Sequence, residues 1–235
     1  MRRTIGAARE AIGCVLSAVV GSPLFKPAVF VVCAVPAARL VWNLWRFFGR
    51  QEFDALGVDP NLTVLHTTGE TAVMILTATL AVTPLRRLLK VPKLHSSRRM
   101  LGVWAFAYAA MHLSAYLIFD QLCYSFETCR FTEIPADVVK RPFIFIGMTA
   151  FTILLALAVT STTGWQRRLR KNWTRLHRLV YVAAAAAIVH YLWIQKSDYT
   201  EPLRWGAVIA VLLGIRVYFH IRGRVSRTSR VTVTS

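Results

Sequence analysis

The sequence predicts an all-α fold, an integral membrane bundle of six transmembrane helices with both termini in the cytoplasm. Three observations favour it. Of the 235 residues, 55% are hydrophobic and only 17% are charged, a composition that soluble globular domains do not show. Six apolar stretches are about as long as a bilayer is thick, and the loops between them alternate between basic and acidic.

The six spans follow from the lengths of the apolar runs. A helix advances about 1.5 Å per residue and needs about 20 predominantly apolar residues to cross the hydrocarbon core. Stretches that meet this requirement or come near it lie at about 27–48, 66–83, 100–119, 142–160, 177–194 and 203–221. We expect each of them to form one transmembrane helix.

The loop charges predict the orientation of the bundle, because Lys and Arg accumulate in cytoplasmic loops. Residues 85–99 carry six Lys or Arg and no acid, and residues 164–175 carry five and no acid. Residues 51–61 are acidic, and residues 120–137 hold four acids against one Arg. The basic loops are therefore predicted to be cytoplasmic and the acidic loops to lie outside.

The same criteria divide the chain into three parts. Residues 1–25 are predicted to be an N-terminal extension, cytoplasmic or interfacial, because their apolar run is short for a span and follows three arginines. A cleaved signal peptide is the alternative. Residues 26–222 form the membrane domain, and residues 223–235 form a basic cytoplasmic tail.

The formal net charge of +18 does not indicate nucleic-acid binding, because the positive charge lies in short loops between apolar spans. No glycine-rich nucleotide-binding motif follows a strand-like run. No Cys-x-x-Cys pair predicts a zinc or thioredoxin-type site. A disulfide between Cys123 and Cys129 is compatible with a loop outside the cytoplasm.

Two histidines lie at the same depth in two different spans. His112 is thirteen residues beyond Arg99 at the inner end of the third span, and His190 is thirteen residues beyond His177 at the inner end of the fifth. At about 1.5 Å per residue, both lie roughly 20 Å from the inner edge, in the outer half of the membrane. A single histidine in an apolar helix is often a hydrogen-bonded core residue, but a matched pair predicts the two axial ligands of a haem.

His177 is expected to serve a different site. Thirteen residues turn an ideal helix by about 220°, so His177 and His190 do not share a face. A partner for His177 on the third span would lie fourteen residues before His112, where the chain has Arg98. Because Arg is not an ordinary axial ligand, Arg98 is predicted to pair with a haem propionate or a flavin phosphate.

Three other residues near the outer ends of the spans are predicted to have structural roles rather than to bind a cofactor. Tyr191 and Trp193 are predicted to be interfacial anchors, because aromatic residues collect at membrane surfaces. His66 is interpreted as a surface cap of the second span, with binding of a quinone or a propionate as the alternative.

In several long stretches the sequence resembles the MsrQ (YedZ) family. These stretches are "TPLRRLLKVP" with "SSRRMLGVWAFAYAAMHLSAYLIFD", "KRPFIFIGMTAF" with "LALAVTST", and "WTRLHRLVYVAAAAAIVHYLW", while "GVDPN" with "LHTTGETAVMILTATLAVTP" fits the region of the second span. The family comprises the haem-binding membrane subunits of periplasmic methionine sulfoxide reductase systems and belongs to the ferric-reductase-like transmembrane group. The likeness covers roughly residues 27–221.

The resemblance implies an electron-transfer subunit of an oxidoreductase, in the bacterial inner (cell) membrane, with no catalytic residue of its own. It implies haem b and FMN as cofactors and the quinone pool as electron donor. The implied acceptor is a periplasmic molybdopterin-containing methionine sulfoxide reductase, MsrP, which repairs oxidised proteins.

The resemblance also implies roles for four residues. His112, His177 and His190 match the family's three haem-associated histidines, and Arg98 matches an arginine at the start of its third helix. Ferric-reductase relatives carry paired histidines in both helices, and Arg98 stands in place of one of them.

Two other functions are distinguished from this one by experiment. A ferric or cupric reductase of the same fold would be a cytochrome b with a different outer acceptor. A non-haem transporter or scaffold would use its intramembrane histidines as proton relays and would be colourless.

Overall fold

The computed structural model describes residues 2–120 and 134–231, and within these ranges the chain is helical with no strand. The α-helices are α1 (Arg2–Gly21), α2 (Phe25–Gly49), α3 (Pro60–Leu88), α4 (Arg98–Ala115), α5 (Ile134–Lys140), α6 (Pro142–Val159), α7 (Thr163–Leu169), α8 (Lys171–Leu176), α9 (Val180–Ile194) and α10 (Thr200–Val231). The shorter elements are the 3-10 helices η1 (Pro92–Ser97) and η3 (His177–Leu179) and the π-helix η2 (Tyr116–Asp120). Cys123 and Cys129 lie outside the described residues.

Six helical segments of the described chain are long and apolar enough to cross a membrane. They are Phe25–Gly49, Pro60–Leu88, Pro92–Phe119, Pro142–Val159, Lys171–Ile194 and Thr200–Arg222. Each coincides with one predicted span, so the prediction of an all-α bundle with six transmembrane helices is confirmed.

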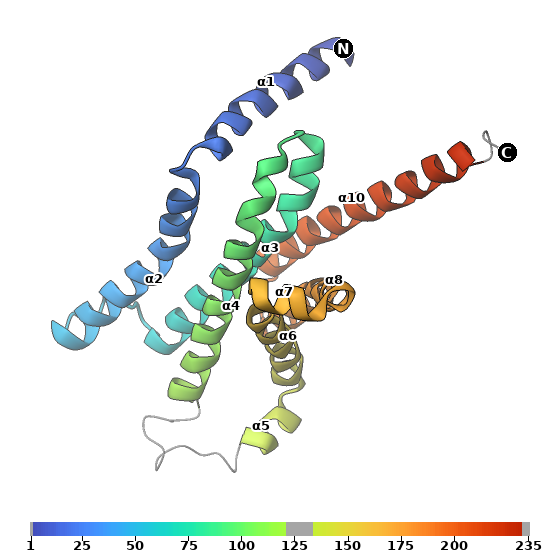
Figure 1. Ribbon diagram of the computed structural model, residues 1–235. Coiled ribbons are helices and arrows are strands. Elements are labelled where there is room, and N and C mark those ends of the chain that lie inside the picture. Colours follow the sequence, from blue (N-terminus) through green and yellow to red (C-terminus); the bar gives the residue numbers. More distant parts are fainter. Residues whose placement is uncertain (1, 121–133, 232–235) are drawn as a thin grey trace.

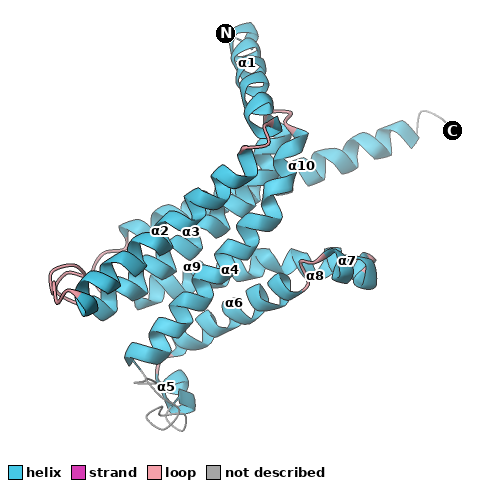
Figure 2. Cartoon of the chain, turned by 60° about the vertical axis from the view of Figure 1, so that its left-hand side comes forward, coloured by secondary structure: helices cyan, strands magenta, loops and turns pink. Residues whose placement is uncertain are grey.

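The two ends of the bundle differ in charge. One end, here called the basic end, carries η1, α7 and α8, and both chain termini lie toward it (Figures 1 and 2). The opposite end carries the loops at 50–59 and 195–199. Helix α1 precedes the first span and extends away from the bundle in both views, and its apolar part, Ile12–Gly21, is shorter than a span.

Helix α3 forms the centre of the bundle. It packs along α4 and against α2, α9 and α10, while α6 packs along α9. Leu80 of α3 and Tyr108 of α4 are fully buried in this core. Ala183 and Ala184 of α9 are also fully buried, because small side chains let neighbouring membrane helices approach closely.

The hydroxyl of Tyr108 connects α4 to the backbone of α2 beside Pro36. It accepts a hydrogen bond from the N–H of Ala37 (2.9 Å) and donates one to the carbonyl of Cys33 (2.7 Å). In a regular helix these two backbone groups would bond to each other. The buried hydroxyl is therefore inserted into the hydrogen-bond ladder of α2 and holds that helix against the core.

Candidate functional site

The structure brings His112 and His190 together between α4 and α9. The centres of their imidazole rings lie 6.2 Å apart, and the ring planes are at 87° to each other. Counting residues predicts that the two histidines lie at equal depth, and in the structure their imidazole rings are neighbours. Both side chains are partly buried, in the half of the bundle farther from the basic end.

The separation of the two rings fits two ligands on opposite sides of one metal ion. If each nitrogen is about 2 Å from the ion and each ring centre roughly 1 Å behind its nitrogen, the ring centres lie about 6 Å apart. No group of three or more His, Cys, Asp or Glu in the described part of the chain is arranged to hold a metal by itself. The pair therefore fits an iron whose other ligands come from a porphyrin.

Backbone carbonyls of two neighbouring helices hold the two rings. Nδ1 of His112 lies 3.0 Å from the carbonyl oxygen of Leu65 in α3, and Nδ1 of His190 lies 2.7 Å from that of Phe143 in α6. A carbonyl only accepts, so each Nδ1 carries the proton and donates it. The tautomer this selects leaves Nε2 of each ring unprotonated and free to bind a metal.

A glycine stands next to each histidine. A Cβ atom placed on Gly69 of α3 would lie 3.0 Å from Nδ1 of His112, and one placed on Gly147 of α6 would lie 2.8 Å from Nδ1 of His190. Gly69 comes four residues after Leu65, and Gly147 comes four residues after Phe143.

This repeated spacing of four residues has a physical reason. Side chains in a helix point toward its N-terminus, so the side chain of residue i+4 lies over the carbonyl of residue i. Glycine at i+4 exposes that carbonyl, and an imidazole of another helix can then donate to it. Gly69 and Gly147 were not predicted, although each is the single glycine of its helix, α3 or α6, and each of these helices neighbours a histidine of the same depth.

A second polar network lies at the opposite end from the basic loops. The hydroxyl of Tyr191, next to His190, donates to a carboxylate oxygen of Glu70 at 2.8 Å, and Nδ1 of His66 lies 3.4 Å from the same oxygen. Tyr191 is buried, with 8% of its surface exposed. The prediction that Tyr191 is an interfacial anchor is therefore wrong, because its ring packs inside the bundle and its hydroxyl has a protein partner.

Two arginines lie near enough to interact electrostatically toward the basic end of the bundle. Arg98 at the start of α4 and Arg216 of α10 repel each other electrostatically. Arg216 donates to the carbonyl of Leu80 (2.7 Å) and to the hydroxyl of Tyr181, over whose ring its guanidinium lies. The side chain of Arg98 makes no hydrogen bond or ion pair within residues 2–120 and 134–231.

Two buried polar atoms toward this end of the described chain have no partner. Nε of Arg216 and the hydroxyl of Thr83, which lies three residues after Leu80 on α3, are buried and have no hydrogen-bond partner among the described residues. Buried polar groups are normally hydrogen-bonded. Two guanidinium groups with unused donors have the chemistry to bind an anion. Arg216 was not predicted, although an arginine inside an apolar span is itself a signal.

His177 lies in η3, at the other end of α9 from His190. Its Nδ1 donates to the carbonyl of Trp173 (3.1 Å), and its ring stacks on the indole of Trp173 with ring centres 3.9 Å apart. It interacts electrostatically with Arg98. The structure therefore groups His177 with Arg98 and separates it from His112 and His190.

Most of the chain is similar to one group of known proteins. The family model for the ferric reductase like transmembrane component matches residues 68–188. The chain is 44% identical over 199 residues to a protein of Xanthomonas campestris pv. campestris (strain 8004), covering 85% of this chain and 88% of the relative. It is 41% identical over 207 residues to one of Xanthomonas axonopodis pv. citri (strain 306), covering 88% and 92%, and 42% identical over 199 residues to one of Herminiimonas arsenicoxydans, covering 83% and 85%. All three relatives bear the name protein-methionine-sulfoxide reductase heme-binding subunit MsrQ.

Proposed function

The chain belongs to the MsrQ family of haem-binding reductase subunits, and we propose that it passes electrons from the quinone pool to a periplasmic methionine sulfoxide reductase. It is a multi-pass protein of the bacterial inner membrane with a role in electron transfer. The donor, the acceptor and the cofactor ligands are the proposed parts of this function.

The observation that carries the proposal is the geometry of His112 and His190. Their ring centres are 6.2 Å apart, and each Nδ1 is occupied by a backbone carbonyl, so both Nε2 atoms are available to one iron. A haem b held there supplies one-electron transfer, which no side chain of this chain provides. The carbonyls of Leu65 and Phe143 fix the tautomer and the direction of each ligand.

The oxidation of the proposed donor and the reduction of the proposed substrate involve equal numbers of electrons and protons. Oxidation of a quinol releases two electrons and two protons, and reduction of methionine sulfoxide to methionine and water consumes the same numbers. The sulfoxide chemistry is assigned to the molybdopterin-containing partner, MsrP in this family, and the electron transfer through the membrane to the present chain.

The function is tested with the purified protein in lipid nanodiscs. Adding a quinol is expected to reduce the haem and to produce the absorption bands of a reduced b-type cytochrome. Adding a periplasmic molybdopterin methionine sulfoxide reductase together with methionine sulfoxide is expected to remove those bands, whereas either addition alone is not. Reoxidation by ferric citrate but not by reductase with sulfoxide would instead identify a ferric reductase, and a colourless protein would contradict haem binding altogether.

A second proposed site lies at the basic end. Arg98 and Arg216 are proposed to bind the phosphate of FMN, the second cofactor that the family resemblance implies, because both carry donors without partners. His177 is proposed as the third haem-associated residue. Its Nδ1 donates to a backbone carbonyl, as those of His112 and His190 do.

Replacing Arg98 with glutamine is expected to lower the FMN content of the purified protein at least tenfold. A hydrogen bond to a charged group contributes about 1.5–3 kcal/mol, and about 1.4 kcal/mol is tenfold in affinity. Acid extraction with flavin fluorescence measures the FMN, and Arg178→Gln, at an exposed cation of the same end, is the control. Loss of haem with full retention of FMN would show that Arg98 binds a propionate, and no change in either cofactor would contradict an anionic site.

A further inference from the structure

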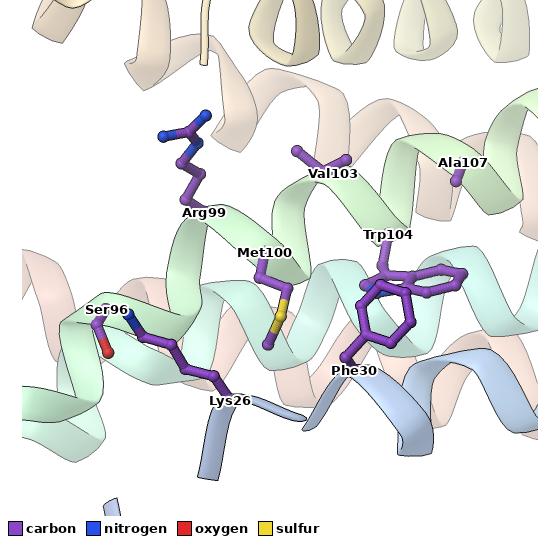
Figure 3. Close-up of a pocket in the computed structure, with 8 residues that line it drawn as sticks. All are labelled: Lys26, Phe30, Ser96, Arg99, Met100, Val103, Trp104 and Ala107. Carbon is purple, nitrogen blue, oxygen red and sulfur yellow. The ribbon is translucent and has the colours of Figure 1, made fainter. Parts of the chain in front are cut away.

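A groove of about 520 Å³ runs between the beginnings of α2 and α4. Its walls are mainly apolar, formed by Phe30, Met100, Val103, Trp104 and Ala107. Figure 3 shows Phe30 of α2 lying against Trp104 of α4, and their ring centres are 5.1 Å apart in an edge-to-face contact.

One end of the groove is cationic. Lys26, Ser96 and Arg99 line it there. Figure 3 shows the side chains of Lys26 and Ser96 extending toward one another, whereas the side chain of Arg99 points away from them. None of the three side chains has a hydrogen bond or ion pair with any residue that the structure describes. Among the described residues, no acidic side chain lines the groove. An anion is therefore the complementary ligand for this end.

The length of the groove matches one leaflet of a bilayer. From Ser96 to Ala107 the lining follows the chain for eleven residues, or about 16 Å at about 1.5 Å per residue. Half of the hydrocarbon core of a bilayer is about 15 Å thick. Because α2 and α4 both cross the membrane, the apolar walls face lipid tails, and the cationic end lies at the level of the basic loops.

The helix that forms one wall is weakly packed at this level. The buried residues of α2 are Cys33 and Leu40, and both come after the part that lines the groove. Lys26 and Phe30 are exposed on the surface of the chain. A bound amphiphile would therefore add to the packing between the beginning of α2 and α4, where the side-chain contact is that of Phe30 with Trp104.

We infer that this groove binds an anionic phospholipid, with the phosphate at Lys26 and Ser96, the positive charge of Arg99 at the same end of the groove, and one acyl chain along Phe30 and Trp104. A quinol has a tail of suitable length but a neutral head, which leaves both cations unpaired. A zwitterionic lipid brings its own cation to the same place. Because each Lys or Arg near a membrane surface attracts anionic lipid, the two cations give a preference for an anionic lipid of about tenfold or more.

The test measures how many lipid molecules the full-length holoprotein retains by native mass spectrometry after exchange into mixtures of phosphatidylglycerol and phosphatidylcholine. The wild type is expected to retain one phosphatidylglycerol at least tenfold more often than one phosphatidylcholine. Lys26→Gln with Arg99→Gln is expected to remove this preference. Lys171→Gln with Arg178→Gln, which removes two exposed cations of the same end, is expected to keep it.

A second variant tests the apolar part. Ala107→Phe fills the tail slot without changing a charge and is expected to lower the retained phosphatidylglycerol at least tenfold, with the haem absorption spectrum serving as the check of folding. Equal retention of both lipids by the wild type, or equal loss in the Lys171/Arg178 control, would overturn the inference. Displacement of phosphatidylglycerol by an equimolar quinol would assign the groove to quinol instead.

Discussion

Replacing His112 with alanine is expected to remove one haem from the protein, and replacing His190 is expected to remove the same one. Each variant takes away one of the two proposed ligand nitrogens, on imidazoles whose ring centres are 6.2 Å apart. A methyl group cannot bind iron, and the space it leaves exposes the pocket to water or lipid. The haem-to-protein ratio from the pyridine haemochrome assay measures the loss, and the remaining low-spin absorption identifies any other haem.

The double variant distinguishes one shared haem from two separate ones. If both imidazoles bind one iron, His112→Ala with His190→Ala loses no more haem than either single variant, because the two residues act as a unit. Loss of twice as much would mean that each histidine holds its own haem. His220→Ala, at an exposed position near the end of the last span, is the matched control and is expected to keep the full haem content. Recovery of the spectrum of His112→Ala with added imidazole would support direct ligation.

The parts of the fold that were predictable from sequence depend on regular helices. Length, apolar composition and loop charge were sufficient for all six spans, because a lipid environment allows few other structures. Counting residues placed His112 and His190 at one depth, since the segments that carry them, α4 and α9, are regular over most of that distance.

The remaining features depend on departures from regular helix or on contacts between helices. His177 lies in the 3-10 turn η3, so its direction relative to His190 does not follow from ideal helix rotation. Arg216 and Tyr181 meet across α10 and α9, and no periodicity in either segment indicates the partner. Tyr191 looked like a surface aromatic because its position near a span end is shared by true anchors, and only the packing against α3 distinguishes it.

Replacing Gly147 with alanine is expected to weaken haem binding about 10–100-fold, the usual cost of losing a partner that orients a metal-binding histidine. The added methyl would lie 2.8 Å from both Nδ1 and Cε1 of His190, closer than nonbonded atoms approach. The imidazole must turn or move away from the carbonyl of Phe143, which breaks the hydrogen bond that fixes its tautomer. The absorption and EPR spectra and the midpoint potential of the haem are therefore expected to change, together with its occupancy.

Two other glycines serve as comparisons for Gly147, because a Cβ atom added to them meets less crowding or none. Gly69→Ala is expected to have the same effect on the His112 side at a smaller size, because the nearest atom there is 3.0 Å away and a slight shift of the ring relieves the contact. Gly214→Ala, in the span of α10 with nothing within 4 Å, is expected to leave the haem unchanged, and to stabilise the helix by up to about 1 kcal/mol. If Gly147→Ala lowers the unfolding temperature but leaves the haem spectrum and potential as in the wild type, the glycine only serves helix packing. The carbonyl of Phe143 would then not be what orients His190.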